Sequence, residues 1–334
     1  MCWPALGVLL AFTAVAHAAD LPGSSTNGWH TWRVPVVEDG PELCCFRWNS
    51  GSASQKHCNL DDGRGSGFAT SNDGRFPADE IQIYAWMDAG TATKIRVLSA
   101  QCPVTSQSEI TDLGVTEANA SIEWLQPYVT GRSATSNDAI IAVALHAGDQ
   151  ARRLLIQTAN GDTHNSTASA NWDTHKDIRE TAVFWMGQAR IEETAADLRN
   201  IMFGDQMPDI REHAAFSYSQ STASDRTEVL IRQGNEDPDP GVRSQAWFWL
   251  AQTEAPESDR AMLAALVSDN EAEVREGLVF ALSQLPEKRS VDALTGILDD
   301  HKVPLETREQ ALFWLAQSES DAAFEYVERL LTEK

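Results

Sequence analysis

The second half of the chain repeats one pattern of apolar and polar residues. The segment Asp-Ile-Arg-Glu-Thr-Ala-Val-Phe-Trp-Met-Gly-Gln begins at Asp177, and related segments begin at Asp209, Gly241, Glu273 and Glu306. The repeated Arg is Arg179, Arg211, Arg243, Arg275 and Arg308, so the copies are 32, 32, 32 and 33 residues apart. A recurrence of this length is typical of stacked supersecondary units.

Each copy predicts two helices, of which the first carries the motif and is called the motif helix. Apolar residues one before, three after and seven after the Arg fall on one side of it. Pro208, Pro240 and Pro304 stand where motif helices should begin, and Asp239 is expected to cap one of them. Neither helix can bury its apolar side alone. The repeats 177–208, 209–240, 241–272, 273–304 and 305–334 are therefore expected to stack into an α-solenoid.

The part before the repeats shows the alternation of short β-strands. Such segments stand at 29–37, 43–48, 80–87 and 94–100. A turn at Asp88-Ala89-Gly90 predicts a hairpin, and the Gly-rich stretch 59–74 predicts a loop. We expect a small β-rich module at 29–118, and a degenerate helix pair with a polar loop at 119–176. The predicted fold class is α+β multidomain, a β-rich N-terminal module followed by an α-α superhelix.

The first residues have the features of a secretory signal peptide. Residues 6–16 are apolar but too short to span a bilayer, and Ala16-His17-Ala18 offers small residues for cleavage. We expect a signal peptide at 1–18, a flexible leader at 19–28, and a periplasmic or secreted mature chain. No later segment is long and apolar enough for stable membrane insertion.

Four cysteines follow the expected signal, namely Cys44, Cys45, Cys58 and Cys102. In an exported chain they predict two disulfides that link the β-rich module. Vicinal cysteines can pair with each other only under strain, so one of Cys44 and Cys45 should reach Cys58 and the other Cys102. A zinc site that includes His57 is the alternative, although a vicinal pair lacks the spacing of familiar zinc loops. We expect no metal and no cofactor.

The acidic composition narrows the possible partners. The formal net charge is −23, from 49 acidic and 26 basic residues. Nucleic-acid affinity depends on Lys and Arg that neutralise phosphates, so no nucleic-acid partner is expected. The sequence also lacks an H-E-x-x-H pair, a G-x-S-x-G elbow and a Gly-rich phosphate loop. No catalytic residue is predicted.

The repeat resembles HEAT repeats, and more closely the bacterial HEAT-like form of phycobilisome lyase-type proteins. The resemblance is carried by the Val-Arg-x-x-Ala-x-x-x-Leu-type helix and by an Asp six residues before the Arg. These are Asp173, Asp205, Asp237 and Asp269, and the last copy breaks the series. With the cysteine module in front, the chain is similar to exported bacterial HEAT-repeat proteins. The resemblance implies an α-solenoid and protein interaction, and it implies no substrate.

Two further rows recur on another side of the motif helix. Phe stands five residues after each Arg, at Phe184, Phe216, Phe248, Phe280 and Phe313, and Gln stands nine after, at Gln188, Gln220, Gln252, Gln284 and Gln317. Trp185, Trp249 and Trp314 follow the Phe in alternate copies. Two interpretations remain open. The rings are core between repeats, or part of the row lines the concave face and binds an extended partner.

The rows of Arg and Asp predict a structural ladder rather than a site, because a site rarely needs five identical copies. The sequence therefore favours a non-catalytic scaffold that binds a protein or peptide on the solenoid surface. One alternative is a lyase-like, tetrapyrrole-related enzyme with a polar cleft and perturbed acids at the domain junction. The other is a carbohydrate-binding β module that exposes Trp29, Trp32, Trp48 and Trp86 on one face.

Overall fold

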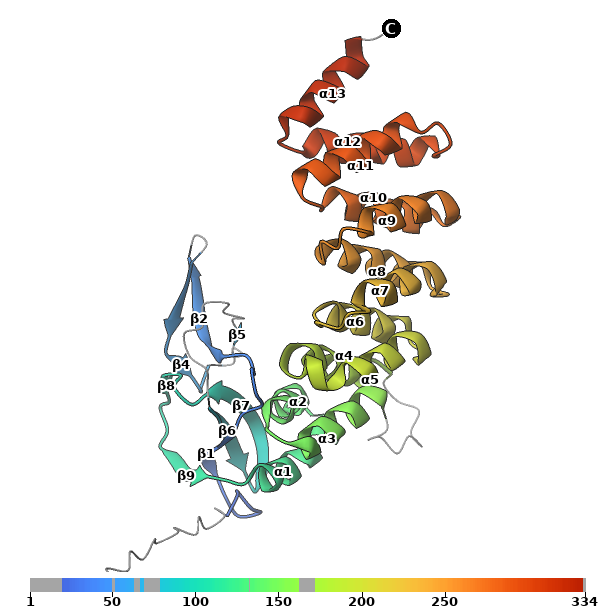
Figure 1. Cartoon of the computed structure of the whole chain (residues 1–334). Coiled ribbons are helices and arrows are strands. Elements are labelled where there is room, and N and C mark those ends of the chain that lie inside the picture. Colours follow the sequence, from blue (N-terminus) through green and yellow to red (C-terminus); the bar gives the residue numbers. More distant parts are fainter. Residues whose placement is uncertain are drawn as a thin grey trace, which may run out of the picture.

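The computed structural model describes residues 20–49, 52–62, 67–68, 79–131, 133–161 and 172–332. The expected signal peptide at 1–18 and most of the expected loops at 59–74 and 160–176 lie outside these residues. Within them, a β-rich part lies beside one end of a long column of helices, and the last helix lies at the other end (Figure 1). The predicted fold class is confirmed.

The hairpin predicted in the N-terminal part forms the edge of its main sheet. The described strands are β1 (Gly28–Pro35), β2 (Leu43–Asn49), β3 (Ser52–Lys56), β4 (Cys58–Asn59), β5 (Gly67–Phe68), β6 (Glu80–Asp88), β7 (Thr91–Ser99), β8 (Val104–Thr105) and β9 (Ile110–Val115). The main sheet has the order β7-β6-β1-β9, with β9 parallel to β1 and the other neighbours antiparallel. Ala89 and Gly90 both have positive φ in the β6–β7 turn. A Cβ on Gly90 would lie 2.4 Å from the backbone of Ser24, so only glycine fits there.

The helical column consists of three helices followed by five repeating pairs. Its helices are α1 (Ala118–Thr130), α2 (Ser136–Leu145), α3 (Asp149–Asn160), α4 (Trp172–Ala189), α5 (Ile191–Gly204), α6 (Pro208–Ser219), α7 (Arg226–Glu236), α8 (Pro240–Gln252), α9 (Ser258–Ser268), α10 (Ala272–Ser283), α11 (Glu287–Asp299), α12 (Leu305–Gln317) and α13 (Asp321–Thr332). The motif helices are α4, α6, α8, α10 and α12. The Asp239 side chain caps α8 by accepting from the N–H groups of Gly241 and Val242, as expected. The first motif helix begins at Trp172, earlier than the pattern predicted.

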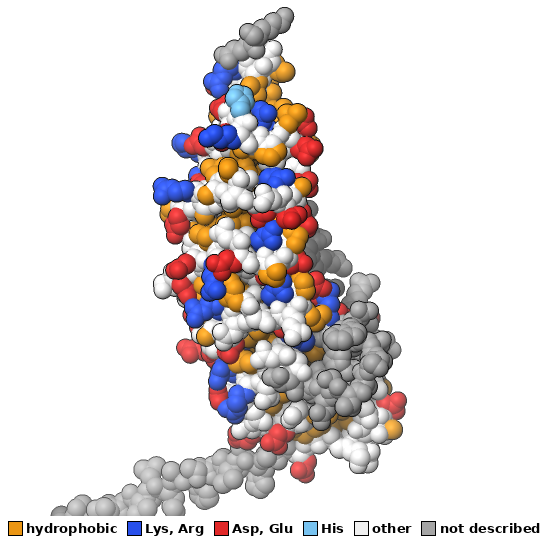
Figure 2. All heavy atoms as spheres, turned by 90° about the vertical axis from the view of Figure 1, so that its right-hand side faces the viewer, with side chains coloured by type: hydrophobic (Ala, Val, Ile, Leu, Met, Phe, Trp, Pro, Cys, Tyr) orange, Lys and Arg blue, Asp and Glu red, His pale blue; other side chains and the backbone are white. Residues whose placement is uncertain are grey.

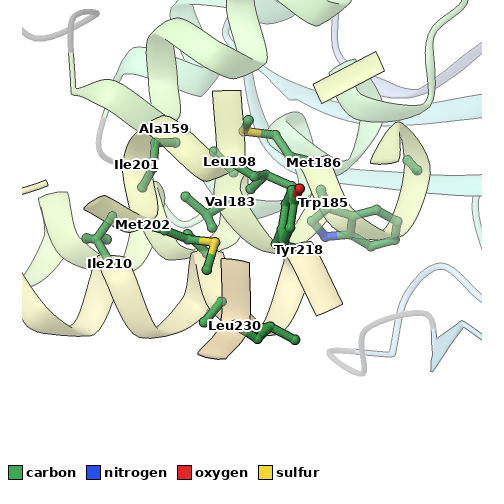
Figure 3. Close-up of a cluster of buried hydrophobic side chains, with 14 of the residues drawn as sticks. Ala159, Val183, Trp185, Met186, Leu198, Ile201, Met202, Ile210, Tyr218 and Leu230 are labelled. Carbon is green, nitrogen blue, oxygen red and sulfur yellow. The ribbon is translucent and has the colours of Figure 1, made fainter. Parts of the chain in front are cut away.

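Neighbouring helix pairs bury their apolar sides against each other. Figure 3 shows Val183 and Met186 of α4, Leu198 and Met202 of α5, and Tyr218 of α6 pointing into one cluster. Motif helices of adjacent repeats pack more closely than the second helices do. The column therefore curves towards the motif-helix side, which becomes its inner face.

The two disulfides hold strand β2 to the neighbouring segments of the module. Cys44 is bonded to Cys102 and Cys45 to Cys58, with Cα–Cα distances of 5.5 and 5.2 Å. The zinc alternative would need these sulfurs as thiolates, and the Sγ atoms of Cys44, Cys58 and Cys102 lie within 4.8 Å of one another. The disulfides pack with Trp29 and other apolar side chains in a small core on one face of the sheet.

The other face of the sheet belongs to the core of the helical column. Trp32 is buried there, and its indole N–H donates to Ser121 Oγ of α1 at 2.8 Å. The Ser121 hydroxyl lies 2.8 Å from Nε2 of His146, whose Nδ1 lies 2.6 Å from the carbonyl of Ala142. The buried Arg190 guanidinium donates to the His146 carbonyl at 2.6 Å. The β-rich module and the solenoid thus share one continuous core.

Acid should weaken this joint through His146. Burial lowers the pKa of His146 to about 4 from 6.5, and the charge of Arg190 adds to this, while the bond to Ala142 opposes it. Between pH 6.5 and 4 the unfolded chain takes up a proton that the folded chain does not, so the free energy of unfolding should fall by about 3 kcal/mol. The stability of His146→Gln should fall less over this range in urea unfolding. His213→Gln, at a part-exposed surface site, is the control; equal slopes in all three proteins would contradict the assignment.

Candidate interaction surface

Aromatic side chains of the motif helices form one unbroken line across the five repeats. Consecutive ring centroids are 4.6–5.8 Å apart, and the Phe184–Phe216 and Phe248–Phe280 pairs are stacked with interplanar angles of 11° and 4°. We call this line the aromatic ribbon; in order it consists of Trp185, Phe184, Phe216, Trp249, Phe248, Phe280, Trp314 and Phe313. Its rings cross the boundaries between repeats, which ties the motif helices together.

The exposure of the ribbon rises towards the C-terminal repeats. Trp185 is buried, and the rings of the second and third repeats are half-buried. Phe280 is 36 % exposed and Phe313 is 55 % exposed. The rings therefore pack between repeats at one end of the ribbon and present apolar faces to solvent at the other.

The Gln row lies one helical turn beyond the ribbon. Gln188 is half-buried, whereas Gln220, Gln252, Gln284 and Gln317 are exposed. The amides of Gln220 and Gln284 each donate to the preceding Ser hydroxyl at 3.0 Å. These local bonds leave the amide oxygens free of protein donors among the described residues, so the row can also accept hydrogen bonds from a ligand.

Two rows of carboxylates flank the ribbon, and the sequence pattern did not single them out. They stand two residues before and one residue after the repeated Arg; we call them the acidic rows: Asp177, Asp209, Glu273 and Glu306, and Glu180, Glu212, Glu276 and Glu309. Both positions are acidic in four of the five copies, with Gly241 and Ser244 in the third. Aligning the copies and reading the polar positions as well as the apolar ones would have found them.

The acidic rows differ in how far the protein itself neutralises them. In the first two repeats, Lys176 forms ion pairs with Glu180 and Asp209. Burial raises the pKa of Glu212, and the nearby carboxylates of Asp209 and Glu180 raise it further against the opposing effect of His213. In the last two repeats, the exposed carboxylates form no ion pair with any described residue; these are Glu273, Glu276, Glu306 and Glu309.

The Arg and Asp rows form hydrogen bonds from one repeat to the next. Both Nε and one terminal nitrogen of Arg211 donate to the Asp237 carboxylate, at 2.8 and 2.7 Å, and the other terminal nitrogen donates to the carbonyl of Asp205 at 3.0 Å. Arg243 repeats this arrangement with Asp269 and the Asp237 carbonyl. Arg179 likewise pairs with Asp205. These guanidinium groups are occupied by the fold.

The regular bonding changes at the fourth repeat. Arg275 donates to the Asp269 carbonyl at 3.0 Å, but its Nε has no partner among the described residues. Asp300 is the C-cap residue of α11, as Asp269 is the C-cap residue of α9. Asp300 lies 25 residues after Arg275 in the sequence, whereas Asp269 lies 26 residues after Arg243. The Asp300 carboxylate accepts from the Lys302 N–H and forms no ion pair with Arg275. The side chain of Asp173, at the other end of the series, lies outside the described residues.

The junction between sheet and helices contains a perturbed acid, Asp138. Burial raises the pKa of Asp138 on α2 to about 6, against the opposing effect of Arg96 on β7, which donates to it at 2.9 Å. Two hollows lined by described residues lie elsewhere. One, of about 570 Å³, is lined by Arg199 and Arg232 of α5 and α7, and the other adjoins it. Neither hollow lies at the junction, where the enzyme alternative predicts a polar cleft.

The described Trp side chains of the β-rich part, Trp29, Trp32 and Trp86, do not form an exposed platform. Trp29 and Trp32 are buried on opposite faces of the sheet. Trp86 packs edge-on against Trp29 with ring centroids 5.5 Å apart. The side chain of Trp48 lies outside the described residues. The burial of Trp29 and Trp32 therefore weakens the support for the carbohydrate-binding alternative.

Comparison with known families supports the solenoid. Residues 227–316, which run from α7 into α12, match the model of HEAT repeats. HEAT repeats are commonly protein-interaction scaffolds and generally lack catalytic activity. No curated protein matches the chain. Among the described residues, no helix combines the length and apolar character that crossing a membrane requires.

Proposed function

We propose that this chain is a non-catalytic scaffold that binds a protein partner on its motif-helix face. The aromatic ribbon carries this proposal. Large apolar rings in an unbroken, increasingly exposed line are costly to leave in water, and aromatic side chains dominate the energetics of protein interfaces. The inner curve of a solenoid is the surface on which an extended partner makes the most contacts.

The charge of the protein supports a protein partner over a nucleic acid. Figure 2 shows one face of the column, on which Lys and Arg, Asp and Glu, and hydrophobic side chains alternate along its length. No broad basic patch gathers among the described residues of that face. With a net charge of −23, the long-range field repels phosphate backbones.

The proposed location is outside the cytoplasm, in the periplasm or the secreted space. Two disulfides are typical of oxidising compartments, which supports this location. The apolar segment 6–16 and the Ala16-His17-Ala18 site support cleavage of a signal peptide after residue 18.

Removing the exposed rings should abolish partner capture without unfolding the solenoid. In the double variant Phe280→Ser, Phe313→Ser, we expect the loss of a partner that the wild-type protein recovers from an envelope or culture extract. Because these rings are partly exposed, the loss of stability should stay below the roughly 3–5 kcal/mol of a buried Phe. Quantitative mass spectrometry of the captured proteins, with circular dichroism of each variant, is the measurement.

The matched control is Val267→Ser, since Val267 is 61 % exposed on α9 in the other helix layer. It should capture the same partner as the wild-type protein. Equal capture by the folded Phe280→Ser, Phe313→Ser variant would refute binding through the ribbon. Loss of capture in both the Phe280→Ser, Phe313→Ser variant and the Val267→Ser control would mean that any exposed apolar side chain matters, which also contradicts the proposal.

A further inference from the structure

We propose that the partner segment bound on the ribbon is rich in Lys and Arg and lies across the last repeats, where its cations meet the rings and the acidic rows together. This inference rests on the proposed function and adds the chemistry of the partner. It is carried by the position of the rows, by the state of their carboxylates, and by an internal example of a bound cation.

The carboxylates and rings lie on one side of each motif helix. Counted at 100° per residue from the Arg, the acidic positions fall at about 160° and 100°, and the Phe position falls at about 140°. Glu276 and Phe280 are i and i+4 neighbours, as are Glu309 and Phe313. A cation placed over either ring therefore also lies near a carboxylate, and both attract it.

The carboxylates of the last two repeats lack an internal counter-ion. Glu273, Glu276, Glu306 and Glu309 are exposed, and the described residues offer them no ion pair. Four like charges beside exposed rings repel each other, and a cationic ligand relieves that repulsion. A second copy of this chain would bring the same carboxylates to this surface, so the charge disfavours self-association here.

The first repeats show how a cation occupies these rows. Lys176 lies between Glu180 and Asp209, which belong to adjacent repeats, and His213 approaches Glu180 to 3.8 Å. The chain itself thus supplies a cation, Lys176, where the ribbon is most buried. Where the ribbon is most exposed, no described Lys or Arg takes that place, and the partner would supply the cation.

A random peptide library tests the chemistry without assuming a sequence. Adjacent helices are about 10 Å apart and extended chain rises about 3.3 Å per residue, so peptides of about 12 residues span the last repeats. Selection on the purified full-length protein should enrich Lys and Arg over Asp and Glu. Selected pools that are neutral or acidic would overturn the inference.

Charge-matched variants then locate the binding. Glu276→Gln, Glu309→Gln should weaken the selected peptides about tenfold in fluorescence anisotropy, as expected for two lost ion pairs. Glu325→Gln, Glu328→Gln on α13 removes the same charge from other exposed positions and should leave affinity within about twofold. An equal loss in both variants would reveal a general charge effect and overturn the inference.

The two proposals fail in different ways. If Phe280→Ser, Phe313→Ser loses the captured partner but the library shows no basic enrichment, the ribbon binds a partner of another chemistry and only this inference fails. If basic peptides are selected and depend on Glu276 and Glu309, while partner capture is unaffected by the Phe variants, the cationic site stands and the ribbon-based function fails.

Discussion

Arg211→Met should lower the free energy of unfolding by about 3–5 kcal/mol, because it strands a buried carboxylate. The Arg211 and Asp237 side chains are 7 % and 3 % exposed and share two hydrogen bonds. Without the guanidinium, the Asp237 carboxylate keeps the Asp239 N–H as a donor but loses its counter-ion. Urea unfolding at pH 7, followed by circular dichroism and Trp fluorescence, is the measurement.

The reason for this loss can be separated from simple truncation. The double variant Arg211→Met, Asp237→Asn removes the stranded charge and should recover roughly 1–3 kcal/mol relative to the sum of the single variants. Arg232→Met breaks the Arg232–Glu236 pair, whose side chains are 59 % and 61 % exposed, and should cost less than about 1 kcal/mol. Similar losses of unfolding free energy for Arg211→Met and Arg232→Met would contradict the expectation that burial makes the Arg211–Asp237 ion pair costly to break.

Removing the Cys44–Cys102 disulfide should destabilise the β-rich module by about 4 kcal/mol. This bond closes a segment with a sequence separation of 58, whereas the Cys45–Cys58 bond closes one of 13. In the chain-entropy account, the shorter loop contributes about 3 kcal/mol. Cys44→Ser, Cys102→Ser should therefore lose more stability than Cys45→Ser, Cys58→Ser in thermal unfolding.

The effect should be concentrated in the module. Its small core of Trp29, Tyr84, Leu98 and the cystines is separate from the continuous core of the column. In the Cys44→Ser, Cys102→Ser variant, the rate of hydrogen exchange should rise in β2, β4 and β8 and change little in α8 to α12. A larger loss from the Cys45–Cys58 variant, or unfolding that spreads equally through the solenoid, would contradict this account.

Acid would destabilise the protein around His146, which is a different place from those affected by Arg211→Met and by removal of the Cys44–Cys102 disulfide. His146 and Arg190 connect the sheet to the first helices, far along the chain from the exposed end of the ribbon. The proposed binding surface should therefore keep its geometry when the joint weakens. The spacing of rings and carboxylates there is set by the stacking of α8, α10 and α12.

The candidate surface was only partly predictable from the sequence. The spacing of Phe and Gln after each Arg located both rows. Which rings are exposed depends on what each repeat packs against, because Phe280 and Phe313 occupy the same position of the repeat as the half-buried Phe184, Phe216 and Phe248. Apolar periodicity does not predict the acidic rows, because it carries no information about the polar positions on the side of the motif helix that faces away from the core.

The sequence by itself determined the repeat, its helix pairs, the hairpin at Ala89-Gly90 and the rule that the vicinal cysteines bond apart. Each of these follows from local periodicity or from the geometry of neighbouring residues. Only the tertiary structure decided that Cys44 pairs with Cys102, that Ser121, His146 and Arg190 join the sheet to the helices, and that the ribbon emerges into solvent. These depend on contacts between residues far apart in the chain, whose free energies no local pattern encodes.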